Sequence, residues 1–333
     1  MSDDKTEAKP LLDVRDLHVD FHTRDGVVHA VNGVSYDVRA GETLAVLGES
    51  GSGKSVTAQA IMGILDMPPG RIPQGEILFQ GRDMLKMSKE ERRKLRGAKI
   101  AMIFQDALSS LNPVLSVGYQ LGEMFRVHQG MSRRAAKAKA IELMDRVRIP
   151  AAKERVNDYP HQFSGGMRQR IMIAMALALE PELIIADEPT TALDVTVQAQ
   201  VMELLADLQR EFNMGLILIT HDLGVVADVA DKIAVMYAGR IVETAPVKEL
   251  YRSPAHPYTR GLLDSIPRLD QKGKELYAIQ GLPPNMAHVP AGCAFHPRCP
   301  VAKDICTTDL PVLAGAGEER GSACHFWKET ING

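Results

Sequence analysis

The residues with the clearest chemistry form one unbroken run, GESGSGKS at positions 48–55, which fits the pattern G-x-x-x-x-G-K-[ST]. The apolar stretch Thr43–Leu47 precedes this run as an expected strand, and a helix is expected to begin near Ser55. Glycines let the backbone curl so that successive N–H groups point at phosphate oxygens, and the helix N-terminus adds partial positive charge. Because this strand–loop–helix context argues against a flexible Gly/Ser turn, the run predicts a nucleoside triphosphate site. The residues expected to bind the nucleotide here are Gly48, Ser50, Gly51, Gly53, Lys54, Ser55 and Val56.

Two carboxylates, Asp187 and Glu188, follow a second apolar run at 183–186. Open α/β sheets bind ligands beyond the carboxyl ends of their strands, so this strand end is expected beside the phosphate loop. There Asp187 could hold Mg²⁺ through its water shell together with the Ser55 hydroxyl, while Lys54 reaches the β- and γ-phosphates. Glu188 could orient and deprotonate an attacking water. Taken alone the pair could be solvated turn carboxylates, but combined with the phosphate loop it predicts hydrolysis.

The elements that position these residues follow from hydrophobic periodicity. Residues 11–21 and 27–39 alternate apolar and polar side chains around the turn signal Asp25-Gly26, which predicts an antiparallel pair of strands. Later strands are expected to alternate with helices, which favours an α/β fold with a parallel sheet covered on both sides. The short apolar runs that predict these strands lie at 99–104, 182–186, 215–220 and 232–237. A stretch from about 106 to 160, rich in Ala, Arg, Lys and Glu, predicts an inserted helical subdomain.

Composition limits the class of protein. The 333 residues carry 39 Lys+Arg against 42 Asp+Glu, a net charge of −3, and only 5% are aromatic. Neither figure favours a nucleic-acid-binding surface. The longest apolar run, 171–179, is about half of the roughly 18–20 residues that span a bilayer. The polar residues 1–10 are expected to be disordered and not a secretory signal, so we expect a cytosolic chain whose contact with a membrane is peripheral.

The last part of the chain has a different character. Ten prolines recur between positions 246 and 311, which excludes long helices and predicts a small loop-rich module over 251–333, after a main domain at 11–250. The four cysteines of the chain all lie in it, in the pattern C-x5-C-x6-C-x17-C: Cys293, Cys299, Cys306 and Cys324. In a cytosolic chain such a group favours a metal over disulfides. The spacing lacks the C-x2-C of common zinc sites and is not the common ferredoxin run.

Over about residues 11–245 the chain resembles the ATP-binding-cassette ATPases, because further motifs occur in that family's order. These are Phe21, Gln105, FSGGM at 163–167, ALD at 192–194, and His221. The resemblance implies a mixed-sheet core, an antiparallel β subdomain and an α-helical subdomain. Departures from the usual LSGGQ signature are Phe163 and Met167, which leave the serine and both glycines in place.

The resemblance also implies roles. Phe21 would stack on adenine, and Gln105 would join Ser55 and Asp187 around Mg²⁺. Gln105, His221 and Lys54 would stabilise the charge of the transferring phosphate. Ser164, Gly165 and Gly166 begin an expected helix whose free N–H groups would face the nucleotide of a second ATPase domain, with Asp194 in the adjacent D-loop. With one phosphate loop and one signature, the chain is expected to pair with a partner.

The tail narrows the resemblance to the oligopeptide and dipeptide importers. SPAHPYT at 253–259, GLPP at 281–284 and GCAFHPRCP at 292–300 are similar to their C-terminal extension, and the chain looks most like the first of their two ATPase subunits. This implies a second ATPase as heterodimer partner, two permease subunits, an extracytoplasmic peptide-binding protein, and a place at the cytoplasmic face of the membrane. Relatives carry peptides, glutathione, nickel chelates or haem precursors, and the cargo stays open.

For the cysteines, the resemblance implies a [4Fe-4S] cluster, with structural Zn²⁺ or unliganded thiols as alternatives and His296 or His325 as possible substitute ligands. We expect this module to serve structure or assembly, away from the ATP machinery. Two rival functions are weaker. A soluble ATPase acting on nucleic acid or ribosomes would need tandem cassettes or a long coiled-coil insertion, and only about a hundred residues separate Ser55 from Ser164. A non-hydrolysing regulatory partner would lack Glu188 and His221.

Overall fold

The computed structural model describes residues 9–24, 26–106, 110–191, 193–266, 278–317 and 319–332. The expected disorder at 1–10 lies almost wholly outside these residues, as does Ala192 of the ALD motif. The chain divides into two compact units. The first comprises residues 1–39, 43–86 and 219–333, and the second comprises 40–42 and 87–218.

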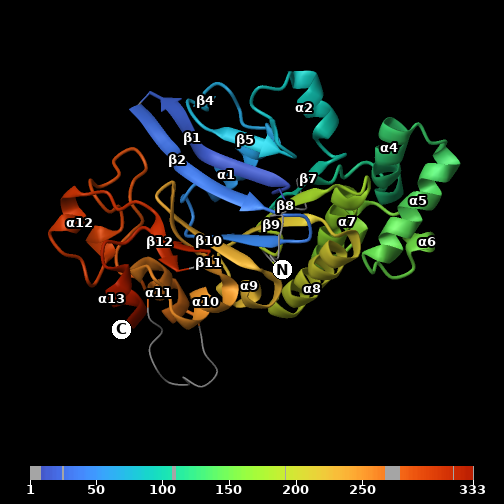
Figure 1. Cartoon of the computed structure of the whole chain (residues 1–333). Coiled ribbons are helices and arrows are strands. Elements are labelled where there is room, and N and C mark those ends of the chain that lie inside the picture. Colours follow the sequence, from blue (N-terminus) through green and yellow to red (C-terminus); the bar gives the residue numbers. More distant parts are fainter. Residues whose placement is uncertain are drawn as a thin grey trace, which may run out of the picture. The chain divides into compact units, whose positions relative to one another are not determined.

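The first unit contains the antiparallel pair that the alternation predicts (Figure 1). Strands β1 and β2 pair along most of their length, and three short strands extend the sheet in the order β2-β1-β5-β6, with β4 also paired to β1. Their bounds are β1 Leu12–Thr23, β2 Gly26–Val38, β4 Gly70–Arg71, β5 Glu76–Phe79 and β6 Arg82–Asp83. Leu12, Val14, Leu17 and Val19 are buried, so the apolar face of β1 is the one that packs inward.

A second set of strands in the first unit carries the phosphate loop. β3 (Thr43–Leu47) is buried along its whole length and pairs in parallel with β10 (Lys232–Tyr237), which forms an antiparallel hairpin with β11 (Arg240–Pro246). This hairpin makes the sheet mixed, where periodicity alone predicts a parallel one. The α/β class itself is confirmed. The helices of this unit up to the extension are α1 Lys54–Met62, α9 Leu223–Val229 and α10 Val247–Arg252.

The proline-rich extension contributes strands to this same sheet. β13 (Arg320–Ser322) pairs with β11, and β12 (Ala314–Gly317) pairs with β13. The sequence does not predict these strands, because both are short and neither shows a clear alternation. The extension's helices are α11 Pro257–Asp264, η2 His296–Arg298, α12 Ile305–Thr308 and α13 Trp327–Asn332.

A buried carboxylate fixes the extension to β11. Glu243 is fully buried and accepts hydrogen bonds from the backbone N–H groups of Ala255, at 2.7 Å, and His256, at 2.9 Å. Arg320 of β13 donates to the same carboxylate at 3.1 Å and is itself almost fully buried. A buried charge is tolerated only when it is paired and hydrogen-bonded, and this one has both kinds of partner. The pair therefore joins the two ends of the extension to one strand.

The second unit holds three neighbouring strands in the order β9-β8-β7, with β7 and β8 parallel. β7 (Ile100–Ile103) and β8 (Leu183–Asp187) are buried throughout, and β9 (Gly215–Thr220) carries the chain back into the first unit. Helices fill the stretch for which helical spacing predicts a subdomain. The helices of this unit are α2 Lys89–Leu95, α4 Val117–Gln129, α5 Arg133–Arg146, α6 Ala152–Arg155, η1 Pro160–Gln162, α7 Gly165–Leu177 and α8 Val195–Phe212.

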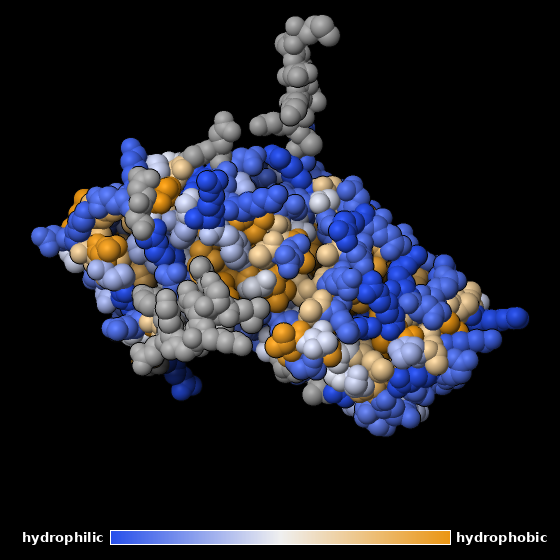
Figure 2. All heavy atoms as spheres, turned by 90° about the horizontal axis from the view of Figure 1, so that it is seen from below, coloured by the Kyte–Doolittle hydropathy of each residue, from blue (hydrophilic) through white to orange (hydrophobic). Residues whose placement is uncertain are grey.

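Hydrophilic residues cover much of the face shown in Figure 2, with apolar residues gathered in patches between them. Among the described residues, no helix combines the length and apolar character that crossing a bilayer requires.

The buried His256 makes the stability of the first unit depend on pH. Its Nδ1 accepts from the Tyr258 N–H at 3.1 Å, so the ring is a neutral N-cap of α11, and burial lowers its pKa to about 3. An unfolded histidine titrates near pH 6.5, so the unfolded state binds the proton first as the pH falls. We expect His256 to contribute a loss of unfolding free energy of up to about 1.4 kcal/mol per pH unit between pH 6.5 and 3.

Urea unfolding at several pH values would measure this. His256→Asn keeps a capping acceptor but cannot titrate, so its stability should fall less steeply with decreasing pH. Identical slopes for the two proteins would contradict the assignment.

Candidate nucleotide site

The phosphate loop connects β3 to α1 through glycines that the surrounding backbone requires. Gly48 and Gly53 have φ values of 150° and 101°, and a Cβ on either would lie within 2.4 Å of a backbone oxygen, of Met236 and Ala30 respectively. Gly51 also has positive φ, at 80°, but a Cβ there would meet nothing within 4 Å. Two of the glycines therefore allow close packing of the loop, and the third mainly allows the turn.

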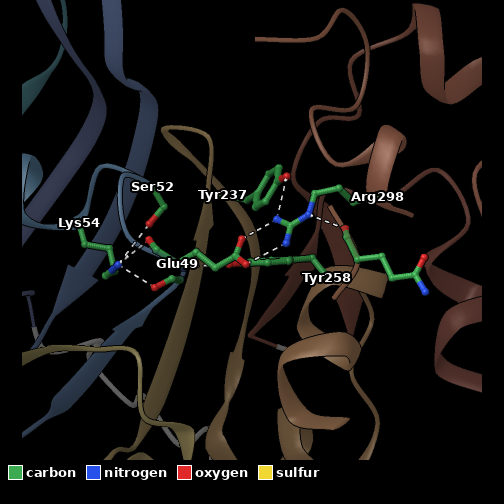
Figure 3. A network of polar contacts seen from close by, with 8 residues as sticks. Glu49, Ser52, Lys54, Tyr237, Tyr258 and Arg298 are labelled. Atoms are coloured by element: carbon green, nitrogen blue, oxygen red, sulfur yellow. Dashed lines mark hydrogen bonds and ion pairs between the residues drawn. The ribbon is translucent and has the colours of Figure 1, made fainter. Parts of the chain in front are cut away.

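Lys54 lies within the loop that precedes it. Its side chain is buried, and its Nζ donates to the carbonyl oxygens of Gly48, at 2.7 Å, and Glu49, at 2.9 Å (Figure 3). A longer contact of 3.4 Å reaches Ser52 Oγ. Ser55 and Val56 follow in the first turn of α1. The loop thus combines a fixed cation with the N-terminus of a helix, which is an arrangement that binds phosphate.

The second unit brings together Gln105 and Glu188, which are 83 positions apart in the sequence. Gln105 Nε2 donates to Glu188 Oε2 at 2.9 Å, and Thr191 Oγ1 donates to the same oxygen at 3.0 Å. Asp187 is the buried last residue of β8, and Glu188 has a φ of 47°, in the left-handed region that costs a non-glycine residue about 1 kcal/mol. The carboxylate of Glu188 is therefore held in a set orientation at the strand end. The sequence motif does not single out Thr191.

The signature segment begins a helix, as its composition predicts. Ser164 caps α7, with its Oγ accepting the Met167 N–H at 3.4 Å, and Asp194 caps α8 by accepting the Val197 N–H at 3.0 Å. A Cβ on Gly166 would lie 2.5 Å from Val197 Cγ1, so glycine lets the start of α7 approach α8 closely. The first turns of α7 and α8 therefore pack against each other.

The two unusual signature residues share one partner. The guanidinium of Arg155 lies 4.1 Å from the ring centroid of Phe163, and its Nη1 lies 3.3 Å from Met167 Sδ. The same side chain bonds Asp158 and the Gln162 carbonyl. An aromatic ring and a thioether are both suited to contact a guanidinium. Phe163 and Met167 thus pack around Arg155 and leave Ser164 in its capping position.

The remaining site residues fall in the first unit. Phe21, near the end of β1, is paired with Val28 of β2 and Gly70 of β4 and is partly exposed. His221 is exposed and directly follows β9, next to Asp222, which caps α9. The first unit therefore holds the phosphate loop, Phe21 and His221, whereas the second holds Gln105, Asp187, Glu188, the signature segment and Asp194.

The four cysteines have free thiols, with Cys306 buried and the others half-buried. Burial raises the pKa of Cys293 to about 11, and the nearness of Cys306, Cys324 and Cys299 adds to the rise. The other three cysteines are therefore close enough to Cys293 to interact with it electrostatically. Among the described residues, no group of three or more His, Cys, Asp or Glu side chains is arranged to hold a metal ion.

Backbone donors nonetheless point at three of these sulfurs. The N–H two residues further on is directed at each, from Phe295 to Cys293, from Val301 to Cys299 and from Phe326 to Cys324. Such N–H···S contacts suit thiolates that bind a metal. The two histidines instead contact carbonyl oxygens, with His296 Nδ1 at 2.9 Å from Cys293 O and His325 Nε2 at 2.9 Å from Asp309 O.

Comparison with known proteins agrees with this geometry. A family model described as ABC transporter matches residues 31–191, and one described as oligopeptide/dipeptide transporter, C-terminal region, matches 242–306. A dimeric ATP-binding cassette solved with ADP and phosphate aligns with a TM-score of 0.64 and 26% identity, over 71% of this chain and 98% of that one. CbiO1 of Clostridium perfringens, part of an ABC transporter complex, aligns with a TM-score of 0.62 and 29% identity, over 73% and 91% of the two chains. Fold and phosphate loop together define an ABC-type ATPase.

Similarity to transport ATP-binding proteins extends over nearly the whole length of this chain. The oligopeptide transport ATP-binding protein OppD of Salmonella typhimurium is 53% identical, covering 92% of this chain and 91% of its own. The dipeptide transport ATP-binding protein DppD of Bacillus subtilis is 53% identical, covering 90% of each. The chain belongs to this family of oligopeptide and dipeptide transport ATP-binding proteins.

The loop geometry predicts that its glycines differ in their tolerance of alanine. Gly51→Ala should cost about 1 kcal/mol of unfolding free energy, because only the positive φ is penalised. Gly53→Ala should cost about 3 kcal/mol or more, because its Cβ also meets the Ala30 carbonyl. Urea unfolding of the two variants, which are matched in chemistry, checks this, and equal losses would show that the close approach is unimportant.

Proposed function

We propose that this ABC ATPase powers the import of peptides, as one of two ATPase subunits that work with two permease subunits at the cytoplasmic face of a membrane. The observation that carries the proposal is the combination of an intact phosphate loop and Glu188 with a C-terminal region matched by the peptide-transporter family model. The named functions of the relatives support the peptide cargo. A nickel chelate, glutathione or a haem precursor is the alternative cargo.

The residues divide the work of ATP hydrolysis between them. Lys54, the loop N–H groups and the start of α1 bind the phosphates, and Phe21 stacks on the adenine. Ser55, Asp187 and Gln105 supply the oxygen ligands that Mg²⁺ prefers, and when bound the cation neutralises charge on the phosphates. Because the amide nitrogen of Gln105 contacts Glu188, its oxygen is the atom that can face a cation. Glu188 orients and deprotonates water, and His221 stabilises the developing charge.

Pairing with a second ATPase subunit completes the site. The helix that begins at Ser164, with Gly165 and Gly166, presents its N-terminus to the nucleotide of the partner, and Asp194 lies in the adjacent D-loop. The partner is a related second ATPase, so the pair is a heterodimer. An extracytoplasmic peptide-binding protein delivers cargo to the permeases, and nucleic acid is not a partner.

The cysteine segment binds a [4Fe-4S] cluster, with Zn²⁺ as the alternative. Four neighbouring thiols and three backbone N–H groups directed at sulfur support a cluster held by Cys293, Cys299, Cys306 and Cys324. When bound, such a group links chain positions that few apolar contacts hold together.

Glu188→Gln tests the proposed function. The amide keeps the shape of the side chain but cannot accept a proton, so ATP binding should persist while hydrolysis falls roughly 100-fold or more. Peptide uptake into membrane vesicles that contain the whole transporter should stop. Glu182→Gln is the matched control, because it changes a carboxylate in the same unit that pairs with Lys99 at 2.6 Å.

Two results would count against the proposal. Normal turnover of the Glu188→Gln protein would remove Glu188 from the role of base. If the wild-type chain copurified with RNA or ribosomes instead of integral permease subunits, the soluble rival would replace peptide import.

Metal and sulfide analysis tests the cysteine assignment. The full chain, purified without oxygen, should contain iron and acid-labile sulfide and absorb visible light, whereas Cys306→Ser should lose both. His325→Gln should keep the metal, because His325 contacts the Asp309 carbonyl and not the sulfurs. A colourless protein with bound zinc would favour the alternative, and metal-free thiols would contradict both.

A further inference from the structure

The C-terminal extension contacts the phosphate loop directly, contrary to the expectation that it lies apart from the ATP machinery. Arg298, in the turn η2 of the extension, donates through Nη1 and Nη2 to Oε2 and Oε1 of Glu49, at 2.6 and 2.9 Å (Figure 3). Glu49 is the second residue of the GESGSGKS run. The fork of the guanidinium matches the two carboxylate oxygens, which is the strongest form of this ion pair.

Arg298 is fixed by other contacts. Only 6% of its side chain is exposed, against 27% for Glu49. Its Nε donates to the Gln280 carbonyl at 3.1 Å and its Nη1 lies 3.3 Å from the Tyr237 hydroxyl. The rings of Tyr237 and Phe295 lie about the guanidinium, with centroids 5.9 and 6.0 Å from Cζ. The pair is therefore shielded from solvent and ordered, unlike most surface ion pairs.

The backbone of Glu49 is held by the same extension. Its N–H donates to the hydroxyl of Tyr258 at 2.9 Å, and Tyr258 is fully buried. Tyr258 packs against Tyr237 and Phe295 with ring centroids 4.6 and 5.3 Å away. The carbonyl oxygen of Glu49 accepts a hydrogen bond from Lys54 Nζ. Side chain, N–H and carbonyl of one residue thus link the extension to the phosphate-binding lysine.

The charges of Arg298 and Glu49 indicate how this link affects phosphate binding. Glu49 adds a negative charge to a loop that binds a strongly negative ligand, and Arg298 neutralises that charge. Without Arg298, the carboxylate would repel the phosphates in a partly buried site, where screening by salt is weak. The loop would also lose a contact that orders it before the ligand binds, which lowers affinity through the entropy of ordering.

We propose that Arg298 is a positioning residue for the phosphate loop, through which the C-terminal extension raises the affinity of the site for ATP. The proposal goes beyond peptide import and needs no metal at the cysteines. It rests only on ATP binding at this loop.

Arg298→Gln tests the proposal in the full-length chain. Calorimetric titration with a non-hydrolysable ATP analogue should give a dissociation constant roughly tenfold higher than for the wild type. Lys303→Gln is the matched control, because it breaks an exposed ion pair of the same extension, Lys303–Glu329 at 2.9 Å. Its affinity should be unchanged.

A second substitution separates the electrostatic role from loss of structure. Adding Glu49→Gln to Arg298→Gln removes the unbalanced carboxylate, so the double variant should bind the analogue more tightly than Arg298→Gln alone. Arg298→Lys keeps the charge without the fork, so its affinity should lie between those of wild type and Arg298→Gln. Thermal unfolding of every variant identifies any that fail to fold. If Arg298→Gln fails to fold, the affinities of Arg298→Lys and Glu49→Gln are compared with that of the wild type instead.

The outcomes are distinct. Affinity of Arg298→Gln within twofold of the wild type would overturn the proposal, and so would a double variant that binds more weakly than Arg298→Gln. Failure of the wild-type chain itself to bind the analogue would instead contradict the ATP site.

Discussion

The close approach of the phosphate loop to its neighbouring backbone is the constraint on which the first unit depends. Backbone hydrogen bonds join the loop to its neighbours. The Gly239 N–H donates to the Ser52 carbonyl of the loop at 3.0 Å, and the Asn32 N–H donates to the Gly239 carbonyl at 2.8 Å. The backbones of β2, of the turn after β10 and of the phosphate loop are thus connected by hydrogen bonds through Gly239. Side chains at Gly48 or Gly53 would separate these segments.

This constraint explains why the turn between β10 and β11 matters. Gly239 has a φ of 77°, and a Cβ there would lie 3.0 Å from the Ala30 carbonyl. The same hairpin leads into β11, whose Glu243 holds the extension. The β10–β11 strand pair therefore contacts both the phosphate loop and the C-terminal extension.

Much of the site could be predicted from the sequence, for a physical reason. The phosphate loop, the strand before it, the helix after it and the helix that begins after Ser164 depend on local chemistry, namely turns, periodicity and helix N-termini. Local chemistry is visible in a short stretch of sequence. The pairing of Gln105 with Glu188 follows from two strand ends that meet at one edge of a sheet.

The contacts that could not be predicted join distant positions without a motif. Arg298 and Glu49 are 249 positions apart, and nothing near either one indicates the other. The short strand β13 gains its partner through tertiary packing and not through its own propensity. Thr191 follows the acidic pair by only a few positions, yet its role depends on how the chain turns after Glu188.

The Arg298–Glu49 pair also has a thermodynamic consequence in the reverse direction. Linkage is reciprocal, so a contact through which the extension favours ATP must let ATP favour the ordered extension by the same factor. Arg298 lies directly before Cys299. The Arg298 N–H donates to the Phe295 carbonyl at 3.0 Å, and the Cys299 N–H donates to the His296 carbonyl at 3.2 Å. Occupancy of the phosphate loop and the order of the segment that carries Arg298 and Cys299 are therefore coupled.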